Sequence, residues 1–592
     1  MARSFPRLPM VLVMAAAPAL MQSATQNAYV QHNLVSDISG MADVTDPNLV
    51  NPWGISESAS SPFWVTDHDK GVTTVYNGSG TISTTVVTIP PASGHTSPAP
   101  ATGQVPGNGT SWVLPAPNGK AASFIFVTED GTVSAWNGSA GTTAVKVVDN
   151  SASGAVYKGV TTNPTGTAPL LYAANFSSGN IDVFDASFQP TSVSGGFSDP
   201  NLPSGFAPFN IWNLGGKLYV MYAKQAPGKQ VDAPAPGNGF VDVFDTSGNL
   251  LQRLVSNGAL NSPWGVAIAP ANWGAFGGDV LVGNFGDGKI NAFDPKTGAL
   301  AGTLQDQNGN ALVNTGLWAI LFGNGKSGGD PNTLYLAAGI TGTDGKIHGL
   351  LAAIAPPSAV TQIGNGASNV AGSIAPGEIV VLNGFTIGPS PLAAATIPTT
   401  GTAALTAGST SVTFNGVSAP VLYASASATS VVVPYEVSGS ATANVVVTYK
   451  SQPSAAFTAQ VAAAAPGIFT LGESGSGEIV AFNSDGSVNG PSNAAAAGSA
   501  VLLFATGEGA VDPAGVDGAI TGEFLHAPLA PVLLTIGGKT ATVVFAASAP
   551  GLIAGVMEVE AIVPSGAGTG AVPVVLTAGT ATSQTGATIS LK

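Results

Sequence analysis

Short apolar stretches alternate with Gly- and Asp-containing turns along the first 355 residues of the chain. The pattern is clearest where Val280, Leu281 and Val282 precede a polar turn at residues 284–288, which is followed by a second apolar stretch at residues 290–293. Two short apolar stretches joined by such a turn predict a β-hairpin. Looser copies occupy residues 63–77, 124–137, 170–185, 218–245 and 334–350. Six copies of one hairpin predict a repeat architecture.

Each hairpin copy is preceded by a further apolar stretch, and most are followed by a polar-edged one. The preceding stretches recur about every 50 residues and predict an innermost strand in each repeat, which makes four strands per repeat. We therefore predict an all-β chain with a six-bladed β-propeller over residues 28–355. The markers of the six innermost strands are Trp53, Trp112, Val160, Trp212, Trp264 and Trp318.

The last copy runs directly into Pro356 and Pro357 and lacks an outer strand of its own. Residues 28–35 have the composition of a strand and precede the first repeat. An open sheet would expose an unpaired edge. We therefore expect residues 28–35 to supply the missing strand and to close the ring.

The composition changes after Pro356, since all eight Trp residues lie at or before Trp318. Residues 356–372 are rich in Pro, Gly, Ala and Ser, which predicts a linker. The remainder repeats itself, because the segment around Phe414 matches the segment around Ile536, 122 residues later. Short strands and Gly-containing turns in each copy predict two immunoglobulin-like β-sandwich modules, at residues 373–470 and 471–592, the second with a connecting hairpin.

Charge and cysteine content exclude several classes of function. The chain has 17 basic and 32 acidic residues, a net charge of −15, so a nucleic-acid backbone would be repelled. There is no cysteine, which excludes disulfides and thiolate chemistry. Residues 1–24 have a basic start, a short apolar core and small residues at the end, which predicts a signal peptide. No later apolar run is long enough to span a membrane. We expect secretion to the exterior or the cell surface, with the periplasm as the alternative.

Residues 29–355 resemble an uncharacterised family of exported bacterial six-bladed propellers. The residues that carry this resemblance are Asn33–Asp37, Leu49–Ile55 and the Asn-Phe-x-x-Gly-x-Ile-x-x-Phe-Asp hairpins. The blades are more distantly similar to lactonase-type and other ligand-binding propellers. The resemblance implies the fold and brings no catalytic residues.

Residues 365–592 resemble a carboxy-terminal domain found in exported proteins of soil acidobacteria. The matching motifs lie at residues 373–378, 414–416, 419–423, 465–469, 485–489 and 505–509. A Gln-x-Asn strand that is usual in this family is absent, since residues 428–432 and 557–561 read Ala-Thr-Ser-Val-Val and Met-Glu-Val-Glu-Ala.

Two sets of residues are candidates for a ligand site. Aromatic residues at the innermost strands could line the central channel and stack on a sugar or another flat ligand. The alternative is that these side chains only pack adjacent blades together. The candidate ligand-binding residues are Trp53, Trp112, Trp212, Trp264, Trp318 and Asn210.

The second set could bind calcium at the mouth of the channel through oxygen ligands. Asp67, Asn175 and Asn284 occupy the same position in their hairpins, and Asn51 precedes the first innermost strand. The alternative is that these short side chains cap their own turns. No other cofactor is indicated, and no pair of carboxylates or metal-ligating histidines stands out.

Two functions agree with these observations. The first is an exported binding or surface-display protein that recognises an extracellular carbohydrate or protein, with the sandwich modules as spacer or attachment. The second is a lactonase-like propeller hydrolase or lyase that acts on a carbohydrate-derived substrate. Scarce histidine and charge favour the first.

Overall fold

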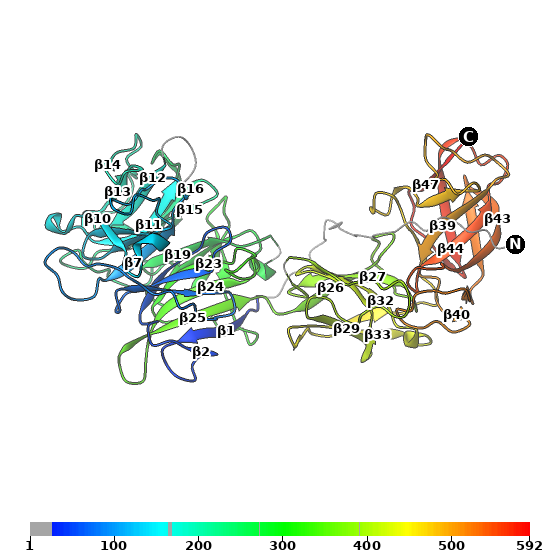
Figure 1. Cartoon of the computed structure of the whole chain (residues 1–592), viewed down its shortest axis with the longest axis horizontal. Coiled ribbons are helices and arrows are strands. Elements are labelled where there is room, and N and C mark those ends of the chain that lie inside the picture. The colour runs from blue at the N-terminus through cyan, green and yellow to red at the C-terminus, as the bar shows by residue number, and fades with distance from the viewer. Residues whose placement is uncertain (1–26, 164–168, 272, 390) are drawn as a thin grey trace. The chain divides into compact units, whose positions relative to one another are not determined.

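The computed structural model describes residues 27–163, 169–271, 273–389 and 391–592 (Figure 1). The chain divides into two compact units, Ala24–Pro356 and Pro357–Lys592. Regular structure in the described residues consists of β-strands and four short 3-10 helices, Gly138–Ala140, Ser151–Ser153, Gly274–Phe276 and Tyr435–Val437. None of the described helices could cross a membrane. The fold is all-β, as the hairpin pattern predicts.

The described residues of the first unit form six sheets of four or five strands, each built largely from consecutive strands and antiparallel except for the parallel pair β1 and β2. Sheet 1 comprises β3 (Pro52–Ser56), β4 (Phe63–Asp67), β5 (Val72–Tyr76) and β6 (Val87–Thr88). Sheet 2 comprises β7 (Ala101–Pro106), β8 (Phe124–Thr128), β9 (Thr132–Trp136) and β10 (Val145–Asp149). Sheet 3 comprises β11 (Tyr157–Asn163), β12 (Leu170–Asn175), β13 (Asn180–Phe184) and β14 (Pro190–Thr191). Sheet 4 comprises β15 (Phe206–Leu214), β16 (Lys217–Lys224), β17 (Phe240–Phe244) and β18 (Leu250–Ser256). Sheet 5 comprises β19 (Pro263–Ile268), β20 (Val280–Asn284), β21 (Ile290–Phe293) and β22 (Leu300–Thr303). Sheet 6 comprises β23 (Leu317–Phe322), β24 (Leu334–Thr341), β25 (Ile347–Ala355), β1 (Val30–Ser36) and β2 (Val44–Thr45).

The first strands of these sheets contact one another in a closed circuit. Strand β3 contacts β7, which contacts β11, and the series continues through β15, β19 and β23 back to β3. This arrangement is propeller-like, with the first strand of each sheet nearest the centre.

Strand β1 completes the last sheet of the circuit as its outer strand. It pairs antiparallel with β25, from Val30 opposite Ala355 to Ser36 opposite Leu350, and Figure 1 shows the two strands side by side. The pairing confirms the prediction that a strand near residues 28–35 supplies the missing outer strand.

The second unit begins with two sheets that share one core. One contains β26 (Ala359–Asn365), β27 (Ile379–Phe385), β32 (Ala428–Val432), β31 (Val421–Ala424) and β28 (Ala393–Ala394); the other contains β30 (Val417–Ala419), β29 (Thr410–Phe414), β33 (Thr442–Tyr449), β34 (Gln452–Pro453) and β35 (Phe457–Gln460). Leu382 and Val431 of the first sheet and Phe414 and Val445 of the second belong to the same buried cluster. The two sheets therefore form layers around a common core.

The prediction of a linker at residues 356–372 is wrong in part. Strand β26 lies within this range and pairs with β27, and Val360 and Ile363 are buried in the core. Pro356 and Pro357 do mark the boundary between the two units. The high Gly and Ala content after them obscured a strand whose Val and Ile side chains face the core.

The rest of the unit forms one ten-stranded sheet and a separate two-stranded one. The large sheet contains β36 (Gly467–Ile468), β37 (Gly477–Glu478), β38 (Ala481–Asn483), β39 (Ala500–Thr506), β42 (Val532–Ile536), β43 (Lys539–Ser548), β44 (Met557–Ile562), β45 (Gly570–Ala578), β46 (Ala581–Thr582) and β47 (Ala587–Leu591); the small one contains β40 (Val511–Asp512) and β41 (Ala527–Pro528). Because β36 pairs with β39, this part begins at Gly467, before the predicted boundary at residue 471.

The internal repeat at 122 residues is visible in the strands. Strand β29 corresponds to β42, and the pair β30 and β31 corresponds to the single long strand β43. Pro420 separates β30 from β31, whereas its counterpart Thr542 lies within β43 and pairs with Ile562. Proline lacks the N–H group that a central strand needs. This one difference leaves two sheets in the first copy and a continuous one in the second.

Candidate functional site

All six first strands of the first unit carry a β-bulge or register irregularity near the same place. The irregularities fall at or beside Trp53, Thr102, Lys158, Phe209, Trp264 and Trp318. Bulges redirect side chains and are frequent beside functional sites. Glycine follows the bulged residue where strands approach closely: a Cβ atom on Gly54 would lie 2.8 Å from the Thr102 carbonyl oxygen.

The bulge residues meet at the centre of the ring and fill it. The ring of Trp53 stacks on that of Trp318, with centroids 3.4 Å apart, and Trp264 and Phe209 each lie 5.9 Å from Trp318. The Lys158 ammonium lies 5.4 Å from the Trp53 ring centroid. The three Trp side chains are buried, which favours the packing role over sugar stacking.

Two hydrogen bonds fix this centre. Trp264 Nε1 donates to the main-chain oxygen of Lys158 at 3.0 Å, and Asn210 Nδ2 donates to the main-chain oxygen of Trp264 at 2.9 Å. Sheets 3 and 5 are not neighbours in the circuit, so the first bond crosses the centre. Together with the packed rings, it closes the middle of the first unit.

The structure brings together some of the predicted ligand-binding residues and separates others. Trp53, Trp264, Trp318 and Asn210 lie at the centre. Trp112 follows the end of β7 and packs in a cluster between sheets 2 and 3, and Trp212 lies late in β15, paired with Tyr219. The placement of Trp112 and Trp212 at the centre is therefore wrong.

The positions that correspond to Trp53 in sheets 2, 3 and 4 are held by Thr102, Lys158 and Phe209. The spacing of the Trp residues in the sequence does not reveal these three positions. A residue followed by Gly within the first strand, as in Thr102-Gly103 and Lys158-Gly159, was the signal that could have found two of them.

A chain of charged side chains lies over this aromatic centre, at the end where the first strands begin. His68 follows β4 and contacts Asp69 through Nδ1 at 2.6 Å and Glu129, which follows β8, through Nε2 at 2.8 Å. Glu129 also forms an ion pair with Lys158 in β11. Sheets 1, 2 and 3 are thus joined by one ionic network. The side chains of His68, Glu129 and Asp69 are 18%, 24% and 39% exposed.

The charged groups of this network shift one another's pKa values. Burial by itself raises the pKa of Glu129, but the hydrogen bond from His68 and the charge of Lys158 lower it to about 2. Burial lowers the pKa of His68, but the hydrogen bonds to Asp69 and Glu129 outweigh this effect and raise it. A carboxylate faces each ring nitrogen, an arrangement that favours the doubly protonated imidazolium form of His68.

Stacked rings connect this network with the interior. The His68 ring stacks on Trp53 at 5.0 Å, Trp53 stacks on Trp318, and Trp318 stacks on Phe285 at 4.1 Å. The imidazolium therefore rests on an aromatic face, an arrangement that favours a cation.

The segment 225–238, within the connection from β16 to β17, adds a third carboxyl group to this end. Asp232 in this segment interacts electrostatically with Lys158 and Glu129, and burial raises its pKa. Its side chain lies beside Ser262, the residue before β19. We call the groups Asn51, His68, Asp69, Glu129, Lys158, Asp232 and Ser262 the mouth cluster.

Two members of the mouth cluster have strained backbones. Asn51 and Ser262 have φ angles of 51° and 46°, and each precedes a proline. Residues other than Gly avoid this region, and such strain is concentrated at functional sites.

The residues predicted to bind calcium mostly serve their own turns. Thr74 Oγ1 donates to Asp67 at 2.7 Å, Asn175 Nδ2 donates to Asp182 at 3.0 Å, and Asn284 Nδ2 donates to Asp287 at 3.0 Å. Asn51 differs, because its Nδ2 donates to Asp69 of the mouth cluster at 3.0 Å. Within the described ranges, no group of three or more His, Asp or Glu residues is arranged to hold a metal ion. Calcium binding stays a prediction.

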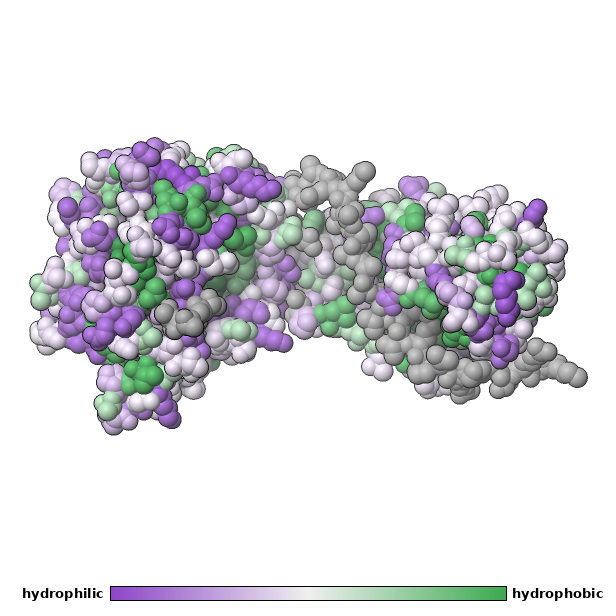
Figure 2. Space-filling view, turned by 90° about the horizontal axis from the view of Figure 1, so that it is seen from above, coloured by the Kyte–Doolittle hydropathy of each residue, from purple (hydrophilic) through white to green (hydrophobic). Residues whose placement is uncertain are grey.

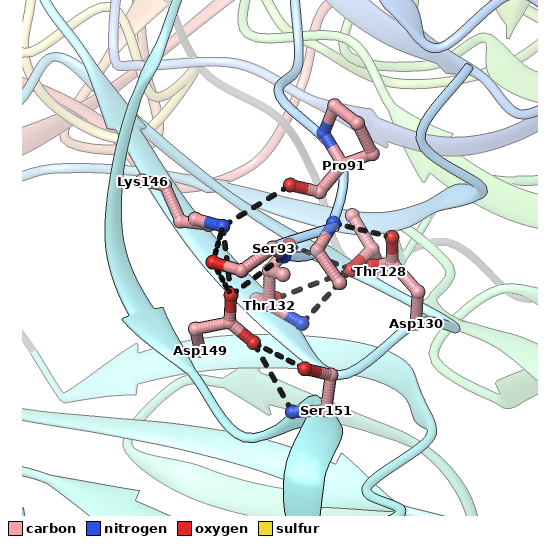
Figure 3. Close-up of polar contacts among 9 residues, drawn as sticks. Pro91, Ser93, Thr128, Asp130, Thr132, Lys146, Asp149 and Ser151 are labelled. Atoms are coloured by element: carbon pink, nitrogen blue, oxygen red, sulfur yellow. Dashed lines mark hydrogen bonds and ion pairs between the residues drawn. The ribbon is translucent and has the colours of Figure 1, made fainter. Parts of the chain in front are cut away.

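A second polar cluster, in sheet 2, has a structural role (Figure 3). Lys146 Nζ donates to Asp149, Ser93 and the main-chain oxygen of Pro91, and the main-chain N–H of Ala92 donates to Asp130. The hydrogen bond from Lys146, with those from Ser151 and Ser93, lowers the pKa of Asp149. These bonds tie the segment around Ser93 to sheet 2 and leave the mouth cluster as the better candidate site.

No model of a known protein family matches the chain. Among solved structures, it is similar to a streptogramin B lyase (13% identity, 56% of this chain and 99% of that chain, TM-score 0.33), to an α-L-arabinofuranosidase mutant from Fusarium graminearum in complex with an iminosugar inhibitor (13%, 55% and 98%, TM-score 0.34) and to a protein of unknown function from Bacteroides thetaiotaomicron (12%, 55% and 76%, TM-score 0.34).

Two proteins of Acanthamoeba polyphaga mimivirus are similar in sequence. Uncharacterized protein R648 is 31% identical over 296 residues, which are 48% of this chain and 71% of the viral protein. Uncharacterized protein L690 is 33% identical over 294 residues, which are 48% of this chain and 76% of the viral protein. The chain belongs to the same family as these two uncharacterized viral proteins.

Proposed function

We propose that the first unit is a six-bladed β-propeller that recognises an extracellular ligand, and that the protein is an exported binding or surface-display protein. The second unit, interpreted as two immunoglobulin-like modules, would act as spacer or attachment. The signal peptide that supports export lies outside the described residues. The six sheets, the closed circuit of first strands and the pairing of β1 with β25 support the propeller.

The observation that carries the binding role is the position of the mouth cluster over a closed centre. The hydrogen bond between Trp264 and Lys158 and the packed Trp rings fill the middle of the ring. A ligand is therefore bound at the mouth surface, where His68, Asp69 and Glu129 are partly exposed. His68 is held between two carboxylates, so neither ring nitrogen is free to act as a base. This arrangement favours recognition over catalysis.

The test is a binding screen of the purified full chain on arrays of polysaccharides, oligosaccharides and extracellular proteins. A Glu129→Gln variant breaks the ionic network, whereas Glu523→Gln changes an exposed residue of the second unit and is the matched control. We expect at least one ligand whose binding is lost in Glu129→Gln and kept in Glu523→Gln. A ligand bound equally by both variants would place recognition elsewhere.

A second candidate function, a hydrolase or lyase for a carbohydrate-derived substrate, is favoured by two carboxyl groups. The pKa of Glu129 is lowered to about 2, while burial raises that of Asp232 nearby. Carboxyl groups with separated pKa values are typical of acid–base pairs. Turnover of a neutral lactone or glycoside that stops in Asp232→Asn, with folding intact, would support the enzyme.

A further inference from the structure

The connection between β40 and β41 contains a segment that crosses to the first part of the second unit. We call this segment, residues 513–520, the strap. The N–H of Ala403 donates to the carbonyl oxygen of Gly518 at 2.8 Å, and the N–H of Ile520 donates to that of Gly401 at 2.7 Å. Residues 401–403 precede β29, so these two bonds join the strap to the first two sheets of the unit.

Both ends of the strap are anchored in the other part of the unit. Strand β40, which precedes it, pairs with β41, and the N–H of Ala554 donates to the carbonyl oxygen of Ala519 at 2.7 Å. Val516, in the middle, is 58% exposed. A surface segment that a few hydrogen bonds hold in place can open locally while the core stays folded.

Two carboxyl groups meet where the strap contacts the first part. Asp517 Oδ1 accepts a hydrogen bond from the main-chain N–H of Tyr435 at 2.9 Å. The Asp517 side chain also forms a hydrogen bond with the side chain of Glu436, which is exposed. Two ionised carboxylates can only accept, so this second bond exists while one of the two groups carries a proton. Burial raises the pKa of Asp517 to about 6, and Glu436 contributes to the rise.

The other titratable groups around the strap do not replace this proton. The Tyr435 ring packs against Gly515 of the strap, and Glu508 acts electrostatically on Tyr435. Burial raises the pKa of Glu508 to about 7, so this group also becomes negative as the pH rises. His526 Nδ1 donates to the main-chain oxygen of Pro513 at 2.6 Å, a bond that both the neutral and the protonated ring can make. After Pro356 the chain has three Lys residues and no Arg.

We infer that the strap is a pH-sensitive clasp, which joins the two parts of the second unit while Asp517 and Glu436 share a proton and opens when that proton is lost. The closed state binds the proton more tightly than the open state. Closure is therefore fully favoured below the ordinary carboxyl pKa of about 4 and is lost as the pH rises through about 6. Above that value two adjacent carboxylates repel each other.

This property would make the proposed spacer more rigid in acid than at neutral or alkaline pH. It belongs to the second unit and does not depend on what the first unit binds. The exposed apolar residues give no comparable candidate. On the face seen in Figure 2, hydrophobic residues form small separate patches between polar ones. The strap by contrast has defined contacts at both ends and a proton-dependent contact between them.

Hydrogen–deuterium exchange of the full chain at pH 5 and pH 8 tests the inference. Asp517→Asn and Glu436→Gln each introduce a carboxamide, which donates to the remaining carboxylate without an added proton. Glu523→Gln changes an exposed carboxyl group outside the strap and is the matched control. The amides to follow are those of Ala403, Tyr435 and Ile520, which bond to or within the strap.

At pH 8 we expect these amides to exchange about tenfold faster in the parent and in the control than in the two carboxamide variants. At pH 5 all four proteins should exchange alike at these positions. Amides of β33, in the core, should exchange more slowly than the strap amides in the parent at pH 8, which shows that the opening is local.

The inference is overturned if the parent and the carboxamide variants exchange alike at pH 8, or if β33 exchanges as fast as the strap. It is also overturned if Glu523→Gln slows the exchange as much as Asp517→Asn does, because general charge and not the pair would then be responsible. Either carboxamide variant is sufficient by itself, so the test stays decisive if the other one fails to fold.

Discussion

Trp264 in β19 donates a hydrogen bond of 3.0 Å to the main-chain oxygen of Lys158 in β11, across the centre of the first unit. The two strands belong to sheets that are not neighbours in the circuit. The bond therefore ties two sheets that sheet 4 separates, and the side chain of Lys158, which belongs to the mouth cluster, lies against Trp53. Lys158 thus contributes its main chain to the closed centre and its side chain to the mouth cluster.

The first prediction concerns this contact. Trp264→Phe keeps an aromatic ring but leaves the Lys158 carbonyl oxygen buried without its partner. We expect a loss of about 1–3 kcal/mol in the free energy of unfolding, measured by chemical denaturation. Trp136→Phe is the control, because Trp136 Nε1 donates to Gly141 at an exposed position, where water can replace the bond. Equal losses in the two variants would contradict a special role for the central bond.

The second prediction concerns the pH dependence of the ionic network. The pKa of His68 is raised in the folded protein, so its stabilising contribution is complete below its unfolded pKa, about 6.5, and is lost as the pH rises through the folded value. The pKa of Glu129 is lowered to about 2, so its contribution is present above about 4.5 and is lost as the pH falls toward 2. His68→Asn should flatten the alkaline side of the stability profile of the first unit. An unchanged alkaline slope, measured by thermal unfolding between pH 5 and 9, would count against this network.

The third prediction concerns two buried glutamates in the second unit. Burial raises the pKa of Glu378 to about 8 and that of Glu508 to about 7, and Glu508 Oε2 has no hydrogen-bond partner. Because the folded state holds these protons more tightly, stability falls as the pH rises from about 4.5 toward 8. Glu508→Gln should remove part of this loss, on the order of 3 kcal/mol at most. Thermal unfolding of the full chain at pH 5 and pH 8 measures the effect, and Glu523→Gln, at an exposed site, should leave the pH difference unchanged.

The fourth prediction concerns ring closure. Removal of residues 24–36 deletes β1 and exposes the edge of β25, which should give an insoluble protein or a much lower melting temperature. Val30→Thr, at an exposed position of the same strand, is the control and should fold normally. A shortened protein that melts like its parent would show that β1 is not needed for closure.

The fifth prediction concerns the start of the second unit. A fragment of residues 357–592 should fold alone, because it retains β26 and the core residues Val360 and Ile363. A fragment that begins at residue 366 lacks this strand and should be less stable or unfolded. Circular dichroism and thermal unfolding compare the two fragments, and identical stability would show that β26 contributes nothing to the core.

The sequence by itself determined the all-β class, the repeat and the strand that closes it. These features follow from local apolar stretches, turn residues and spacing, which are read along the chain. The boundary at Pro356 was also readable, whereas β26 was not, because its Gly- and Ala-rich surroundings resemble a linker. Pro420 was visible in the sequence, but only its position between β30 and β31 shows that it divides a sheet.

Only the tertiary structure decided which residues meet at the centre and at the mouth. Trp112 and Trp212 have the expected spacing but lie away from the centre, while Lys158 and Phe209 take bulge positions that a search for Trp could not find. His68, Glu129 and Asp232 are far apart in the chain and come from three sheets. Their interaction, and the pKa shifts that it produces, depend on how the ring closes, since electrostatic coupling follows distance in space and burial rather than position in the sequence.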